Sequence, residues 1–127
     1  MSGFPIIKGI AFEDGGAVNL ARVTNYTGSN VTQASLTSIH YSVYDLTSST
    51  LTVSSTSLTV SGVVYDTLQT SAIWTLDSTG YNFLHVLPAS ALPDGDHVYR
   101  VDYKFTPSSG EVFWQPFEIT TLPIYVS

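Results

Sequence analysis

The chain has 127 residues, no cysteine and a formal net charge of −6, with 4 Lys and Arg residues in total. This length predicts one domain, residues 1–127, that buries a single core without disulfides or a thiolate-bound zinc. Because cations are so scarce, we expect no binding to nucleic acid phosphates and no electrostatic attachment to anionic lipid.

The residue usage predicts an all-β protein. Charged residues make up 11% of the chain, whereas Thr, Ser, Val and Tyr are abundant. β-Branched and aromatic residues favour strands over helices. No apolar run approaches the roughly 20 residues of a membrane helix. The start "MSGFPIIKG" lacks the basic and apolar regions of a signal peptide, so we expect a soluble protein.

Two short strands are predicted at the beginning of the chain. Residues 6–14 form the first, which ends at a Gly-Gly pair typical of a turn. Residues 17–24 form a second strand or an extended edge segment, in which Val18 and Leu20 alternate with smaller side chains.

The strongest pattern in the first half lies at residues 35–46. Ile39, Tyr41 and Val43 share one face of this predicted strand, and His40 lies on the other face. We therefore expect His40 to face solvent rather than to bind a metal.

The Ser/Thr-rich stretch that follows also alternates with period two. Its apolar residues flank a polar "SSTS" centre, which predicts a hairpin of two short edge strands within residues 51–60. Further strands are predicted at residues 63–65, 73–76 and 81–86, with Trp74 as a buried aromatic residue between two sheets. The connection after them should contain one short helical turn.

The last third of the chain predicts the clearest hairpin. The strand within "HVYRVDYKFT" places four side chains inward, namely Tyr99, Val101, Tyr103 and Phe105. Its outward face carries Arg100, Asp102 and Lys104, which predict a ladder of surface ion pairs. The returning strand contains Pro116, which cannot donate to a ladder, so this strand must be bulged or at an edge there.

Together these segments predict an antiparallel β-sandwich or barrel of about seven to nine short strands. The stretch "LPDGDHVYRV" resembles the corner before the penultimate strand of immunoglobulin-like sandwiches. That resemblance implies that Tyr99 bonds back to the backbone of residues 89–94, with Leu92 filling the core and Asp94 in the turn. Val101 stands where antibody domains have a cysteine, which excludes an antibody-type disulfide core.

The same stretch offers an alternative, a metal site. Asp94, Asp96 and His97 lie within four residues, and Ca²⁺ binds carboxylates spaced in this way. A complete site needs six or more oxygen ligands, however, and no acidic loop with a terminal glutamate follows. We also find no nucleophile elbow, phosphate-binding loop or zinc spacing. We therefore expect no metal, no cofactor and no catalytic residue.

The Thr/Ser-rich series of strands has "FEDGGAVNL" near its start and "DGDHVYRVDYKFTPSSGEVFWQPFEI" near its end. In these features the sequence resembles the small β-sandwich proteins of tailed bacteriophage virions. Those proteins serve as capsid decoration, neck or tail components. The resemblance implies a non-enzymatic virion subunit, assembled in the host cytoplasm, that contacts other virion proteins or copies of itself. The alternative is a carbohydrate-binding or adhesion module with exposed aromatic residues.

The ending "FWQPFEITTLPIYVS" suggests where such contacts occur. Leu122, Ile124 and Tyr125 are apolar, and no charge follows the single glutamate of this stretch. The tail either forms a last edge strand on its own domain or contacts neighbouring subunits. Phe113 or Trp114 would join that contact, because adjacent strand residues cannot both face the core.

Overall fold

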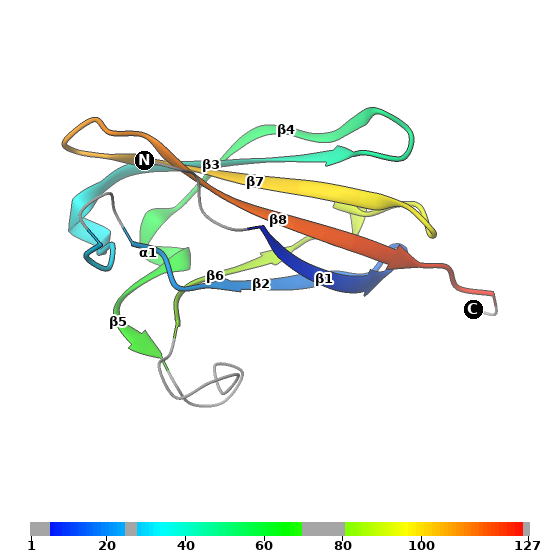
Figure 1. The fold of residues 1–127 in the computed structure, drawn as a ribbon, viewed down its shortest axis with the longest axis horizontal. Helices are drawn as coiled ribbons and strands as arrows, with labels where there is room; N and C mark the ends of the chain where they lie inside the picture. Colours follow the sequence, from blue (N-terminus) through cyan, green and yellow to red (C-terminus); the bar gives the residue numbers. More distant parts are fainter. Residues whose placement is uncertain (1–5, 25–27, 70–80, 126–127) are drawn as a thin grey trace.

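The computed structural model describes residues 6–24, 28–69 and 81–125. These residues form two β-sheets that pack face to face as a sandwich, shown in Figure 1. Strands account for 61% and helices for 9%, which confirms the all-β prediction. The expected strand at 73–76 and Trp74 lie outside the described residues.

The larger sheet has five strands in the order β1-β8-β7-β3-β4. Their bounds are β1 Ile7–Phe12, β8 Phe113–Leu122, β7 Val98–Pro107, β3 Leu36–Asp45 and β4 Thr50–Leu58. The smaller sheet has three strands in the order β2-β6-β5, with bounds β2 Ala17–Ala21, β6 Tyr81–Leu87 and β5 Val64–Gln69.

The strand pairs depart in one place from the predicted antiparallel arrangement. β1 pairs with β8 in parallel, whereas all other pairs among the described strands are antiparallel. A parallel pair needs a long connection, and here that connection is nearly the whole chain.

Helices in the described residues are short connections. They are α1 (Val60–Val63) and two 3-10 turns, Gln33–Ser35 and Ala89–Ala91. The last of these confirms the helical turn predicted before β7. No helix of the described part has the length and apolar character required to cross a bilayer.

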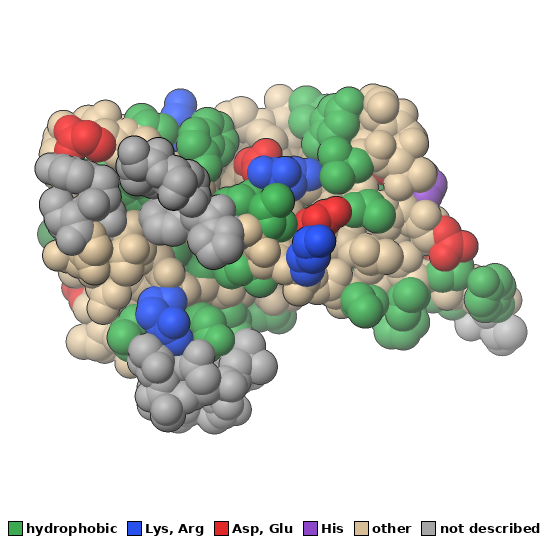
Figure 2. Space-filling view, viewed as in Figure 1, with side chains coloured by type: hydrophobic (Ala, Val, Ile, Leu, Met, Phe, Trp, Pro, Cys, Tyr) green, Lys and Arg blue, Asp and Glu red, His purple; other side chains and the backbone are tan. Residues whose placement is uncertain are grey.

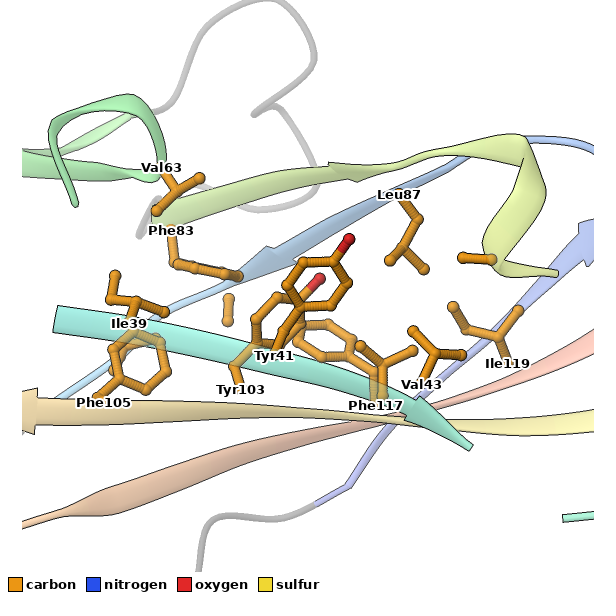
Figure 3. Packing of buried hydrophobic residues seen from close by; sticks show 14 of the residues in the cluster. Ile39, Tyr41, Val43, Val63, Phe83, Leu87, Tyr103, Phe105, Phe117 and Ile119 are labelled. Atoms are coloured by element: carbon orange, nitrogen blue, oxygen red, sulfur yellow. The ribbon is translucent and has the colours of Figure 1, made fainter. Parts of the chain in front are cut away.

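The core lies between the two sheets and is rich in aromatic residues (Figure 3). The inward set predicted for β7 is confirmed, since Tyr99, Val101, Tyr103 and Phe105 are all fully buried. Phe83 of β6 reaches them from the other sheet. Its ring lies edge-on to the rings of Tyr103 and Phe105, with centroid distances of 4.8 and 5.4 Å. Such contacts add to the burial free energy that holds the sheets together.

The predicted hairpin within residues 51–60 is wrong. This stretch is one strand, β4, which pairs with β3 and contains two register shifts. Between Tyr41 and Val43 of β3 the partner advances from Thr56 to Val53, so one extra residue is accommodated on β4. Each extra residue shifts the alternation, which explains why the sequence resembles two short strands.

Of the two predictions for the strand at Pro116, a bulge or an edge, the structure shows the edge. Its partner in β7 is Asp102, and the register there is continuous. Pairing of β8 with β1 starts only at Phe117, so Pro116 has a strand neighbour on one side among the described residues. Pro116 therefore interrupts no described pairing between β8 and β1.

Candidate functional site

The corner before β7 is built as predicted around Tyr99. The Asp94 backbone N–H donates to Tyr99 Oη at 2.9 Å, and the side chains of Tyr99 and Leu92 are fully buried. Burial raises the pKa of Tyr99, so its hydroxyl stays protonated at neutral pH. The phenol thus ties the turn to the core.

Replacing Tyr99 with Phe removes this hydrogen bond and keeps the ring. We expect a loss of about 0.5–1.5 kcal/mol in the free energy of unfolding, because the Asp94 N–H loses its acceptor. Urea denaturation measures this loss. Tyr125→Phe is the matched control, since that side chain is 88% exposed and should contribute nothing measurable. Equal stabilities for wild type and Tyr99→Phe would contradict the corner.

Folding brings a second acid to this corner that the sequence did not reveal. Asp45, the last residue of β3, is 1% exposed, and its Oδ2 lies 2.6 Å from His97 Nδ1. Its Oδ1 accepts the backbone N–H groups of Thr47 and Ser48 at 2.9 and 3.1 Å. An aspartate that caps the following turn is common, but only the fold places His97 beside it.

The charges at this corner support one another. The hydrogen bond to Asp45 raises the pKa of His97, and the carboxylates of Asp94 and Asp96 act in the same direction. Burial by itself raises the pKa of Asp45, but hydrogen bonds from His97 and Ser48 outweigh it, and the net shift is downward. Near neutral pH the arrangement therefore favours a charged Asp45–His97 pair.

The three residues considered as an alternative metal site come together only in part. The ligand atoms of Asp45, Asp94 and His97 lie within 4.8 Å of one another. Asp96 stands outside this group: its backbone has a φ of 57° and its N–H donates to the Thr121 carbonyl. Three ligands are fewer than Ca²⁺ requires, and both Asp45 oxygens already accept hydrogen bonds. The geometry is better suited to holding the loop before β7 against the sheet than to binding a metal.

A buried polar network lies between the sheets. Asn19 and His85 are cross-strand partners in β2 and β6, and both point toward Tyr103 of β7. Asn19 Nδ2 donates to Tyr103 Oη at 2.9 Å, and His85 Nδ1 lies 2.7 Å from the same oxygen. Burial lowers the pKa of His85 to about 4. His85 is therefore neutral at neutral pH, and a hydrogen bond joins its Nδ1 to the Tyr103 hydroxyl.

The third feature is a band of exposed apolar side chains, which we call the apolar strip. Its members lie on the outer face of β1, at the end of β8 and in the residues that follow. They are Ile10 (72% exposed), Phe12 (56%), Leu122 (39%), Ile124 (45%) and Tyr125 (88%). Phe12 pairs directly with Leu122, which joins the β1 part of the strip to the end of β8. Figure 2 shows hydrophobic side chains over β1 and the C-terminal end.

The tail does not form a last edge strand. β8 ends at Leu122, and residues 123–125 leave the sheet. Pro123 packs against the turn before β7, where a Cβ on Gly95 would lie 2.6 Å from the proline Cα. The Ile124 N–H donates to Glu13 Oε1 at 2.6 Å. The tail is thus held in place while Tyr125 stays exposed.

Phe113 and Trp114, the other predicted interface residues, face opposite sides of β8, as strand alternation requires. Phe113 is buried and stacks on Phe105 with centroids 5.1 Å apart, whereas Trp114 is 49% exposed. Trp114 does not join the apolar strip, because the eight residue steps from it to Leu122 span roughly 26 Å of strand. Lys104 Nζ lies over the Trp114 ring, 5.9 Å from its centroid.

The predicted ion ladder on the outer face forms only in part. Arg100 Nε donates to Asp102 Oδ1 at 2.9 Å, but Lys104 is placed over Trp114 instead. Lys8 of β1 lies 3.8 Å from Glu118 of β8. Exposed pairs such as these contribute little stability.

The end of the sandwich that carries the tail is also acidic. Backbone hydrogen bonds join the turn after β1 and the loop before β7 to each other and to β8. This end gathers half of the 10 Asp and Glu residues, namely Glu13, Asp14, Asp45, Asp94 and Asp96. Beside it a shallow groove of about 300 Å³ opens between β1 and β2. Acidic and apolar side chains therefore share one end of the molecule.

Comparisons with models of known protein families, with curated proteins and with solved structures found no match. The geometry of these three features therefore carries the functional argument.

Proposed function

We propose that the chain is a non-enzymatic structural subunit that acts through protein–protein contacts in the virion of a tailed bacteriophage. It would serve there as capsid decoration or as a neck or tail component and would assemble in the host cytoplasm. The apolar strip is the observation that carries this proposal. Contiguous exposed apolar surface on a folded domain marks an interaction site, because water solvates it poorly and a partner covers it.

An immunoglobulin-like topology is part of the proposal. In such domains the second, fourth and fifth strands share one sheet, and the third, sixth and seventh share the other. With β4 taken as the extra strand of variable-type domains, β2-β6-β5 and β8-β7-β3 correspond to these two sets. The bond between Tyr99 and the preceding turn adds support.

The bonding of the polar clusters supports a role without catalysis. Asp45 and His97 tie one loop to the sheet, and Tyr103 connects Asn19 with His85 inside the sandwich. Each of these groups stabilises the fold through its partners. They supply a rigid body that presents the apolar strip.

The tail part of the strip is tested by a double variant, Ile124→Ser with Tyr125→Ser. We expect its incorporation into virions of the source phage to fall at least about tenfold, because the contact loses its apolar anchors. Quantitative mass spectrometry of purified particles measures this. Val112→Ser is the control, since Val112 is 43% exposed and precedes the opposite end of β8. Normal incorporation of the double variant, or absence of the wild-type chain from virions, would refute the proposal.

The exposed Trp114 favours a second candidate, a carbohydrate-binding or adhesion module. An accessible indole face can stack on a sugar ring through its apolar surface. In that case Trp114→Ala would abolish binding on a glycan array, and the tail double variant would not. Neighbouring genes separate the two candidates: portal and capsid genes support the virion subunit, whereas glycoside hydrolase genes support the binding module.

A further inference from the structure

We propose that β1 pairs with β1 of a second copy of this chain, antiparallel and across a two-fold axis at Ile10. The two five-stranded sheets would then join into one continuous sheet. This inference rests on the proposed function as a subunit acting through protein contacts, and it names a second copy as a partner for the β1 part of the apolar strip.

The outer edge of β1 is suited to strand pairing. β1 is the terminal strand of its sheet and pairs with β8 without interruption, from Ile7 opposite Phe117 to Phe12 opposite Leu122. Its other edge has no strand partner among the described residues. Natural edge strands are usually protected by bulges, prolines or charged side chains. β1 has neither bulge nor proline, and its one charge, Lys8, lies 3.8 Å from Glu118 of the neighbouring β8. By contrast, β4 and β5, at other sheet edges, both contain register shifts.

The side-chain pattern selects the register. Lys8, Ile10 and Phe12 share the outer face of β1, together with the facing Glu118, Thr120 and Leu122 of β8. A two-fold axis at Ile10 keeps these faces together and places Lys8 of each copy opposite Phe12 of the other. The most exposed apolar side chain of the strand, Ile10, then packs on its own copy. On the inner face Gly9 would lie opposite Ala11, where small side chains avoid crowding.

Charge complementarity favours a second copy in this register. A net charge of −6 opposes self-association, so the contact must bring opposite charges together. Glu13 and Asp14 follow Phe12 directly in the turn after β1. The pairing therefore brings Lys8 of each copy alongside the acidic turn of the other, twice per dimer. An axis at Gly9 would instead place Lys8 opposite Ile10, farther from both acids.

A single cysteine tests the contact directly. The chain has no cysteine, so Ile10→Cys can form a disulfide only between two copies. Directly opposed residues in antiparallel strands have Cα atoms about 4.5–5.5 Å apart, within the range of a disulfide. We expect most of this variant to run as a covalent dimer on non-reducing gels after mild oxidation. Leu51→Cys is the control, because Leu51 is 52% exposed on β4, at the far edge of the same sheet, and should stay uncrosslinked.

Sedimentation equilibrium tests the uncrosslinked protein. We expect wild type to populate a dimer at about 50 µM, a concentration at which weak interfaces associate. Ile10→Lys should weaken the dimer at least about tenfold, because four lysines would then crowd the axis, and Lys8→Glu should weaken it by charge repulsion. Leu51→Lys, at the far edge of the sheet, should leave it unchanged. Circular dichroism confirms that the variants remain folded.

The inference is overturned if wild type is monomeric at that concentration, or if Ile10→Cys crosslinks no better than Leu51→Cys. A monomer that still enters virions through its tail would leave the proposed function intact. A dimer that is absent from virions would have the opposite meaning, since it would support this inference and refute the virion role.

Discussion

Replacing Asp45 with Ala should lower the free energy of unfolding by about 3 kcal/mol. The carboxylate is 1% exposed and accepts hydrogen bonds from two backbone N–H groups and from His97. Each donor left without its acceptor costs about 1 kcal/mol or more, and the bond to a charged group costs most. Urea denaturation at pH 6 measures the change.

Asp94→Ala is the matched control for this prediction. Its side chain is 60% exposed, and its Oδ2 lies 3.9 Å from His97 Nδ1, too far for a direct hydrogen bond. Removing it should change stability by less than about 0.5 kcal/mol. If the two substitutions cost the same, Asp45 does not hold the corner as described.

The Asp45–His97 pair also has a defined pH window. The pKa of His97 is raised, so its contribution is complete below the ordinary value of 6.5 and is lost as pH rises through the folded pKa. The pKa of Asp45 is lowered, so its contribution is complete above 3.8 and is lost as pH falls through the folded pKa. The pair therefore stabilises the fold most between about pH 4 and 6.5.

Acid should destabilise the wild-type protein through His85 by about 2 kcal/mol between pH 6.5 and pH 4. Burial lowers the pKa of His85 to about 4 from 6.5. The unfolded chain therefore binds more protons across this range, and stability falls as pH falls. The full shift corresponds to roughly 3 kcal/mol, which partial solvent screening reduces. Protonated His85 would also direct a second donor at the hydroxyl of Tyr103, beside Asn19.

His85→Gln isolates this effect, because a glutamine keeps a hydrogen-bonding group and cannot take up a proton. Thermal or urea denaturation at several pH values gives the slope of stability against pH. We expect the variant to lose about 2 kcal/mol less than wild type between pH 6.5 and 4. His40→Gln is the matched control, because it makes the same substitution on the outer face of β3, away from the network. Parallel profiles for wild type and His85→Gln would contradict the network.

Local patterns in the sequence were sufficient to predict which side chains of the inner strands face the core. Period-two alternation identified the inward face of β7, and the burial of Tyr99, Val101, Tyr103 and Phe105 confirms it. The bond between Tyr99 and the Asp94 backbone was predictable because both residues belong to one short segment. Likewise, adjacent strand residues must face opposite ways, so one of Phe113 and Trp114 had to lie outside the core.

Features that depend on distant segments were decided only by the tertiary structure. The bulges of β4 are defined by its pairing with β3, and they shift the apolar alternation that the sequence shows. In β2 the polar Asn19 faces the core while Val18 faces solvent, because Tyr103 from the other sheet supplies a buried partner. Burial of a polar group is favourable only with such a partner, which a local pattern does not reveal.

Contacts between distant segments also explain which residues meet at the corner before β7. Asp94 and His97 are close in sequence, but Asp45 lies 52 residues from His97 and meets it only because β3 and β7 are neighbours in the sheet. The parallel pairing of β1 with β8 likewise joins the two ends of the chain and places Phe12 beside Leu122. The sequence by itself determined which residues alternate, and the sheet pairing decided which of them meet, because strand neighbours are chosen by long-range contacts and register.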